Sequence, residues 1–423
     1  MPAMIYRGAI LHAIDRDTIA FFPDGGLLVE RGRIVACQQF EQLHEQCPRV
    51  AVADWRGSLI IPGLVDAHVH LPQTEAIGAE RDNLLTWLEE VIFPTERKFR
   101  DSSYAELIAH AFFQQALAAG VTAMVVFAPP YEEATEVCFH AAYERGIRVT
   151  MGMTLMDTNV PEDLCGTPDE LIAASERLAA RWHNKGRLRY CITPRFAGSC
   201  SLELLKRCGE TAQAMGLPIQ THLAESPSEL QLIKCLFPLH RDYTSVYEDT
   251  GILSERTLLA HCIYLTSDEL EKIEQSRAAI VHCPSSNVYL QSGIMPLAEY
   301  LDSYNIPIGI GSDIGAGYNW SMLREARAAR ECSKIRHIQG HSRRIISLEE
   351  AFYLATLGGA HAIGLAHEVG NFAVGKAADF VRVSVPSYRS LTTARQALEY
   401  LLYAGTEAIL STTIEGECVW QRP

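Results

Sequence analysis

The segment IPGLVDAHVH, residues 61–70, decides the fold expected for this chain of 423 residues. It indicates a short apolar strand that follows a Pro-Gly turn and ends in two histidines, His68 and His70. Residues i and i+2 of a strand point to the same face, so both imidazoles are expected to project together from the end of the strand. This geometry suits two nitrogen ligands of one metal ion, although an HxH pair alone is a weak signal.

Seven further apolar stretches follow this strand and alternate with segments of helical periodicity, which is clearest at 104–119 and 269–276. Eight strands alternating with helices predict an α/β fold, namely a closed (β/α)8 barrel with insertions. An open doubly wound sheet is the alternative, but no GxGxxG phosphate loop follows any strand. The predicted strands are 63–70, 121–128, 148–155, 190–196, 218–225, 257–262, 279–284 and 308–314.

Both ends of the chain are predicted to be β-structure. Residues 4–62 contain short runs rich in β-branched and apolar residues, with a turn at 31–33. The last stretch contains a strand behind a Gly turn at 375–385 and a hairpin across Glu415-Gly416. We therefore expect a composite β-sandwich from residues 1–62 and 372–423, beside a catalytic barrel of residues 63–371.

Composition restricts the possible partners and the compartment. Asp and Glu outnumber Lys and Arg by 51 to 37, and the net charge of −14 argues against nucleic acid and anionic membranes as partners. No stretch approaches the ~20 apolar residues of a membrane span, and the N-terminal segment meets a charge too early for a signal peptide. Twelve cysteines without a CxxC pair indicate reduced thiols of a cytoplasmic protein.

Polar residues also stand at the ends of the later strands, where a barrel builds its active site: His222, His261, His282 and Asp313. A buried aspartate is costly unless it is paired or binds a cation, so we favour a shared metal ion. Nitrogen and carboxylate ligands without thiolate suit Zn²⁺, with Fe²⁺ as the alternative. Glu225, three residues after His222, is either a helix-capping carboxylate or, beside a metal, a proton shuttle.

The motifs IPGLVDAHVH, THLAE, AHC, HCPSSN and GSD, in this order, resemble the amidohydrolase superfamily across essentially the whole chain. The resemblance implies a deformed (β/α)8 barrel with a composite β-sandwich. The fourth strand lacks the lysine that bridges two metals in some members, which indicates the one-metal branch, where deaminases predominate. Its implied catalytic residues are Glu225 as proton shuttle, with His261 and Asp313 holding the hydroxide. The implied ligands of one Zn²⁺ per chain are His68, His70, His222 and Asp313.

Segments outside the metal motifs narrow the resemblance to the guanine deaminase family within this branch. They are WLEEVIFPTERKF at 87–99, TPRFAGSC at 193–200, DYTSVYEDTGIL at 242–253 and the stretch 354–376. Two small departures from the family pattern are Ser226 and Ala316-Gly317, and neither changes a metal ligand. The resemblance also implies a homodimer.

This narrower resemblance implies a small purine substrate that contacts Gln73, Arg195 and Phe196, beside His222, His261 and Asp313. The guanidinium of Arg195 offers planar donors, the amide of Gln73 offers both donors and an acceptor, and Phe196 can stack on a flat ring. Without the neighbouring metal site, Arg195 is equally suited to a salt bridge, Gln73 to a loop and Phe196 to the core.

Three other functions remain open. One is a deaminase of a related amino-heterocycle, such as 8-oxoguanine, isoxanthopterin, ammeline or a cytosine-type substrate. Another is a ring-opening hydrolase of the dihydropyrimidinase type, which requires the bridging lysine. The third is a non-enzymatic scaffold, which is expected to have lost ligands. The role of His282 is open, with a place behind the ligands favoured, and 87–99 and 242–253 are both candidates for a lid over the pocket.

Overall fold

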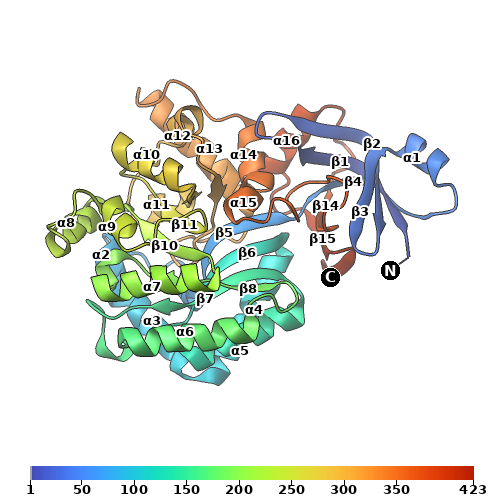
Figure 1. Ribbon diagram of the computed structural model, residues 1–423. Coiled ribbons are helices and arrows are strands. Elements are labelled where there is room, and N and C mark those ends of the chain that lie inside the picture. The colour runs from blue at the N-terminus through green and yellow to red at the C-terminus, as the bar shows by residue number, and fades with distance from the viewer. Residues whose placement is uncertain (1) are drawn as a thin grey trace.

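Strands from both ends of the chain form one seven-stranded sheet at one side of the molecule, where both termini lie (Figure 1). The computed structural model describes residues 2–423, and the order of this sheet is β16-β15-β14-β4-β1-β2-β3. β1 and β4 are parallel, and all other neighbours are antiparallel. These strands are β1 (Met4–Ala13), β2 (Ile19–Glu30), β3 (Arg33–Gln39), β4 (Ala51–Pro62), β14 (Phe380–Ser384), β15 (Ile409–Ile414) and β16 (Glu417–Gln421). The two ends of the chain thus share one sheet. That this sheet packs against a second sheet, as the predicted composite β-sandwich requires, remains a prediction.

Two tight turns of this sheet follow from local sequence. Arg31-Gly32 joins β2 to β3, and Glu415-Gly416 joins β15 to β16. All four residues have positive φ, between 46° and 79°, as the turn type that matches the twist of a two-residue hairpin requires. Both turns occur where the sequence predicts them.

The middle of the chain contains two parallel sheets, so the predicted α/β class is confirmed. One has the order β5-β6-β7-β8, with β9 paired to β7, and the other has the order β10-β11-β12-β13. The strands are β5 (Leu64–His70), β6 (Val121–Ala128), β7 (Arg148–Leu155), β8 (Leu188–Tyr190), β9 (Thr193–Pro194), β10 (Ile219–Leu223), β11 (Thr257–His261), β12 (Ala279–His282) and β13 (Ile308–Ile310). All eight predicted strands are present, but closure into one barrel stays a prediction.

The fourth predicted strand is broken, which corrects the single strand expected at 190–196. β8 ends at Tyr190, and β9 contains only Thr193 and Pro194. Pro194 has no N–H to donate to a ladder. Cys191 passes very close to β7, since a Cβ added at Gly152 would lie 2.0 Å from the carbonyl oxygen of Cys191. The break turns the following residues, Arg195 and Phe196, toward the site described below.

Helices cover the parallel sheets (Figure 1). Four of them, α6, α8, α10 and α14, begin with a Ser or Thr cap and a Glu that hydrogen-bond reciprocally. The longer helices are α4 (Ser102–Ala118), α5 (Glu132–Arg145), α6 (Pro168–Trp182), α7 (Leu202–Met215), α8 (Pro227–Leu236), α10 (Ser267–Ser276) and α13 (Met322–Ile338). The shorter ones are α9 (Tyr243–Asp249), α11 (Pro284–Tyr289), α12 (Leu297–Ser303), α14 (Leu348–Leu354) and α15 (Leu357–Ala362). α4 and α10 match the two helices predicted from periodicity.

Two helices lie within the end segments that the sequence predicts to be β. α1 (Phe40–Gln46) buries Phe40 and Leu43 against β1 and β2. α16 (Ala394–Tyr403) begins at Thr393, whose side chain accepts from the N–H of Gln396. Both are amphipathic, so their apolar residues repeat with the helical period and not with the period of two expected of a strand. No helix in residues 2–423 has the length and apolar character needed to cross a bilayer.

Candidate active site

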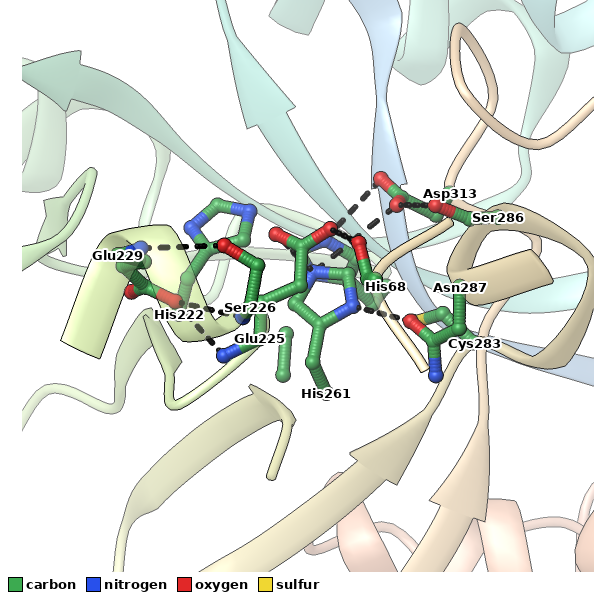
Figure 2. Close-up of polar contacts among 12 residues, drawn as sticks. His68, His222, Glu225, Ser226, Glu229, His261, Cys283, Ser286, Asn287 and Asp313 are labelled. Atoms are coloured by element: carbon green, nitrogen blue, oxygen red, sulfur yellow. Dashed lines mark hydrogen bonds and ion pairs between the residues drawn. The ribbon is translucent and has the colours of Figure 1, made fainter. Parts of the chain in front are cut away.

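Three histidines face one another at the ends of β5 and β10, and Figure 2 shows two of them, His68 and His222. The Nε2 atoms of His70 and His222 are 3.1 Å apart, and His68 belongs to the same cluster. All three are buried. Nδ1 of His222 lies 2.6 Å from the carbonyl oxygen of Arg195, which can only accept, so Nδ1 carries the proton and Nε2 has a free lone pair. The predicted HxH geometry is therefore present, and a third imidazole completes it.

Asp313 follows β13 and brings a carboxylate to these rings. Its Oδ1 lies 3.3 Å from Nε2 of His68 and 3.4 Å from Nε2 of His70. Its Oδ2 accepts a 2.6 Å hydrogen bond from the hydroxyl of Ser286. Burial alone would raise the pKa of Asp313, but its electrostatic interactions with the surrounding histidines hold it well below its usual range. Asp313 is thus an anion facing the histidine cluster.

These donors fit a divalent cation. Nε2 of His68 is buried and has no hydrogen-bond partner, as expected of a lone pair directed at an ion. Cys283 also lies close to His68 and Asp313, but burial raises the pKa of its thiol well above the usual value. A thiol that keeps its proton is a poor ligand. Three imidazoles and a carboxylate are a set that suits Zn²⁺.

Glu225 and His261 form a second pair beside this cluster. Nε2 of His261 lies 3.5 Å from Oε2 of Glu225 and 3.9 Å from Oδ2 of Asp313. Burial raises the pKa of Glu225 to about 7. Burial lowers the pKa of His261, but the facing carboxylates of Glu225 and Asp313 outweigh it, and the net shift is upward. A carboxyl group with a pKa near neutrality can both take up and deliver a proton.

The backbone at Glu225 is fixed by the start of α8. Its N–H donates to Oε2 of Glu229 at 2.7 Å, and Glu229 also closes the capping box with Ser226. The hydroxyl of Tyr243 donates to the other oxygen of Glu229 at 2.9 Å. Ser226, one of the two positions that depart from the family pattern, is therefore the N-cap of α8.

One segment after β12 hydrogen-bonds three side chains of the site, namely Asp313, His261 and Glu225. These contacts were not predicted from the sequence. Ser286 donates to Asp313, and the amide oxygen of Asn287 accepts from Nδ1 of His261 at 2.8 Å (Figure 2). The hydroxyl of Ser292 donates to Oε1 of Glu225 at 3.0 Å. The motif HCPSSN carried the signal, because two of the three residues lie in it. Since the second ring nitrogen of His261 is held by Asn287, Nε2 is directed at the carboxylates.

Asn287→Ala is expected to lower kcat by about 10-fold to 100-fold, because hydrogen bonds to charged groups are worth about 1.5–3 kcal/mol. Asn287→Asp keeps the acceptor and is expected to retain more activity. The matched control is Asn371→Ala, which removes a partly buried amide donor to Ala13 in the terminal sheet. Steady-state kinetics on the three variants checks this. Equal activity of the two Asn287 variants would contradict the positioning role.

Glu325 of α13 anchors the start of this segment. Its carboxylate accepts from the N–H and hydroxyl of Ser285 and from the amide of Asn319, at 3.2, 2.8 and 2.7 Å. Burial raises the pKa of Glu325 to about 8, although these hydrogen bonds lower it. The folded protein thus keeps a proton that the unfolded chain loses near pH 4.3.

Glu325 is expected to make stability fall as the pH rises. Its stabilising contribution is complete below the unfolded pKa and is lost as the pH approaches 8, with a slope of at most about 1.4 kcal/mol per pH unit. Glu325→Gln is neutral throughout and removes this term. Melting curves from pH 5.5 to 8.5 are expected to show a steeper loss of Tm in the wild type than in the variant. Parallel curves would contradict the assignment.

A cavity opens over these groups. Gln73, Arg195 and Phe196 line it, as do His70, His222, Glu225, His261 and Asp313. The structure therefore brings every predicted site residue to one place, with His68 beneath the others. Glu96, which the sequence argument missed, lies behind the wall and accepts a 2.7 Å hydrogen bond from Nη1 of Arg195.

The two candidate lids differ in position. Trp87 lines the cavity together with Leu84 and Leu88, from the helical stretch α2 (Leu84–Trp87), η2 (Leu88–Ile92) and α3 (Phe93–Arg97). No residue of the other candidate, 242–253, lines it. There, the hydroxyl of Tyr247 in α9 donates to the carbonyl oxygen of His222 at 2.7 Å, behind the histidine cluster. His282 is buried without a partner at either ring nitrogen and is not part of the wall.

Known proteins share this sequence and structure. The sequence model of the amidohydrolase family matches residues 59–416. Guanine deaminase of Escherichia coli (strain K12) is 36% identical over 415 residues, which cover 96% of this chain and 93% of that protein. Guanine deaminase of Dictyostelium discoideum is 31% identical, with 96% of each chain covered.

Solved structures agree with these relatives. Guanine deaminase from Bradyrhizobium japonicum matches with a TM-score of 0.96 at 29% identity, and 100% of each chain is covered. Guanine deaminase from C. acetobutylicum, solved with guanine bound in the active site, matches with a TM-score of 0.93 at 29% identity over 99% of this chain and 100% of that chain. The chain therefore belongs to the amidohydrolase family. Within it, the chain groups with the guanine deaminases, which confirms the resemblance drawn from the motifs.

Proposed function

We propose that this protein is a guanine deaminase, a hydrolase that converts guanine and water to xanthine and ammonia. The observation that carries the proposal is the cavity itself. Its floor holds the histidine cluster, Asp313 and Glu225, and its wall holds hydrogen-bonding side chains suited to the edge of a purine, Gln73 and Arg195. The relatives of known name support the same reaction.

We assign one Zn²⁺ to His68, His70, His222 and Asp313. When bound, such an ion makes a hydroxide nucleophile available at neutral pH by lowering the pKa of a water molecule to about 7. Fe²⁺ is the alternative ion. The free Nε2 lone pairs of His68 and His222 and the anionic character of Asp313 support this ligand set.

Glu225 moves the protons in the proposed reaction. Its Oε2, which faces His261, takes a proton from the attacking water while the water oxygen bonds to C2 of guanine. Glu225 delivers that proton to N3 and then assists protonation of the 2-amino group. The C2–N bond breaks and ammonia leaves, so atoms balance as guanine plus water gives xanthine plus ammonia. Asp313 and His261 orient the attacking oxygen, and Ser292 holds Oε1 of Glu225.

We also propose how the purine is bound, where the protein is located, its oligomeric state and its domains. Gln73, Arg195 and Phe196, beside His222, His261 and Asp313, are assigned to purine binding from their place in the cavity wall. A role in purine breakdown and a homodimer are proposed from the family resemblance. A cytoplasmic location is proposed from the twelve cysteines, which are all free and agree with a reducing compartment. Two backbone hydrogen bonds join the parallel sheets, Gln220 to Ile192 and Asp313 to His68, and support one distorted barrel. The proposed domains of the chain are a composite β-sandwich of residues 1–62 and 372–423 and a catalytic barrel of residues 63–371.

The test follows guanine by ultraviolet absorbance and released ammonia, with metal content measured on the same sample. We expect conversion to xanthine with about one divalent ion per chain. The same assay on 8-oxoguanine, isoxanthopterin, ammeline and cytosine separates the related activities. A metal-replete protein that leaves guanine unchanged would overturn the proposal.

A further inference from the structure

Glu96 lies behind the cavity wall and contacts two polar side chains that line it, Gln73 and Arg195. It belongs to α3 and is 1% exposed. Its Oε2 accepts from Nη1 of Arg195 at 2.7 Å, and its Oε1 accepts from Nε2 of Gln73 at 3.4 Å. Gln73 and Arg195 line the cavity, whereas Glu96 does not. It therefore acts on a ligand only through its two partners.

The contact with Glu96 fixes which end of the Gln73 amide is free. A carboxylate has no proton to donate, so the NH₂ group of Gln73 must face Glu96. The amide oxygen then lies on the other side, against Gly315, where an added Cβ would come within 2.4 Å of it. Gln73 lines the cavity, and because its NH₂ group is committed to Glu96, the amide oxygen is the group that remains as an acceptor for a ligand.

The same contact balances the charge of Arg195. Arg195 is 3% exposed, and a buried cation without a partner is strongly unfavourable. Glu96 supplies the anion, and the ring of Phe93, one turn earlier on α3, lies 5.6 Å from the guanidinium carbon. The pair is neutral overall, and the remaining N–H groups of Arg195 are donors only. The wall therefore offers a donor from Arg195 and an acceptor from Gln73.

We propose that Glu96 is the positioning residue that makes this pocket select 6-oxopurines over 6-aminopurines. The inference rests on the proposed function. Guanine presents an acceptor at O6 next to a donor at N1–H, which matches Arg195 and Gln73. 2,6-Diaminopurine carries the same 2-amino leaving group but presents a donor at C6 next to an acceptor at N1. That reversed pattern leaves buried donors and acceptors unpaired, which is the strongest basis for rejecting a substrate.

Glu96→Gln is the decisive variant because its amide can donate to Gln73. The Gln73 amide is then free to turn and present NH₂ to the cavity. We expect kcat/KM for guanine to fall by about 10-fold or more, mainly through KM, because the groups at O6 and N1–H keep their hydrogen-bonding pattern while C2 is attacked, so these contacts hold substrate and transition state alike. The ratio of kcat/KM for guanine to that for 2,6-diaminopurine is expected to fall by at least about 10-fold.

The matched control is Glu350→Gln. Glu350 is a buried carboxylate on α14 that binds Arg344 at 2.7 Å and does not line the cavity. This variant is expected to lower Tm while leaving the guanine to 2,6-diaminopurine ratio unchanged. A merely structural role for Glu96 would produce the same result in Glu96→Gln, with equal losses for both substrates, and would overturn the inference.

Competitive inhibition of the wild type provides a second measurement that does not depend on the folding of a variant. Hypoxanthine presents the 6-oxo and N1–H pattern, and adenine presents the reverse. We expect hypoxanthine to inhibit at an at least about 10-fold lower concentration, and equal inhibition would overturn the inference. Wild-type protein that deaminates guanine but fails this comparison refutes the role of Glu96 alone. Metal-replete protein that does not deaminate guanine refutes the proposed function instead.

Discussion

Glu225→Gln is expected to lower kcat for guanine by about 10²–10⁴-fold while the protein keeps its metal and its fold. The amide preserves the shape of the side chain and can still hydrogen-bond Ser292, but it can neither take the proton of the attacking water nor return it. Steady-state kinetics, metal analysis and a melting curve on one preparation check the prediction.

A matched control separates this loss from the general effect of neutralising a buried carboxylate. Glu269 is buried, caps α10 and accepts from the hydroxyl of Thr244 at 3.1 Å, but it does not line the cavity. Glu269→Gln is therefore expected to lower Tm with kcat close to that of the wild type. Near-normal turnover by Glu225→Gln would remove Glu225 from the mechanism.

His68→Ala is expected to lose metal and activity together. Even partners that only orient a ligand are worth about 10–100-fold in metal affinity, so removal of a ligand is expected to cost more than about 100-fold. Metal content by elemental analysis and deamination of guanine should fall in parallel. The control is His12→Ala, because His12 is also buried but lies in β1 of the terminal sheet. Unchanged metal content in His68→Ala would show that the ligand assignment is wrong.

The proximity of the proposed metal ligands could be predicted because these residues stand at the ends of strands. Parallel strands bring their carboxyl ends to one edge, so His68, His222 and Asp313 could be expected to meet without any knowledge of loops. The positions of all eight strands followed from the same apolar runs. The break in the fourth strand was missed, although Pro194 is a signal visible in the sequence. The close approach of Cys191 to Gly152 at this break is a tertiary contact that the sequence does not indicate.

The supporting residues could not be predicted, because their partners are set by loops and helices. Glu96 reaches Arg195 from a helix far away in the chain, and no periodicity in the sequence indicates that contact. Ser292 reaches Glu225 from the turn after α11, outside any motif. α1 and α16 were missed because β-structure was assigned to whole end segments, although the amphipathic pattern of both helices is visible in the sequence.

The terminal sheet has a consequence for how the protein is made. β4 is hydrogen-bonded on one side to β1 and on the other to β14, which leaves the ribosome only after the long segment that contains the parallel sheets. Until then, the nascent chain exposes an open β-edge of apolar residues, which is a template for aggregation. Prematurely terminated chains that lack β14 are therefore expected to be substrates for chaperones and proteases, even though they already contain every proposed metal ligand.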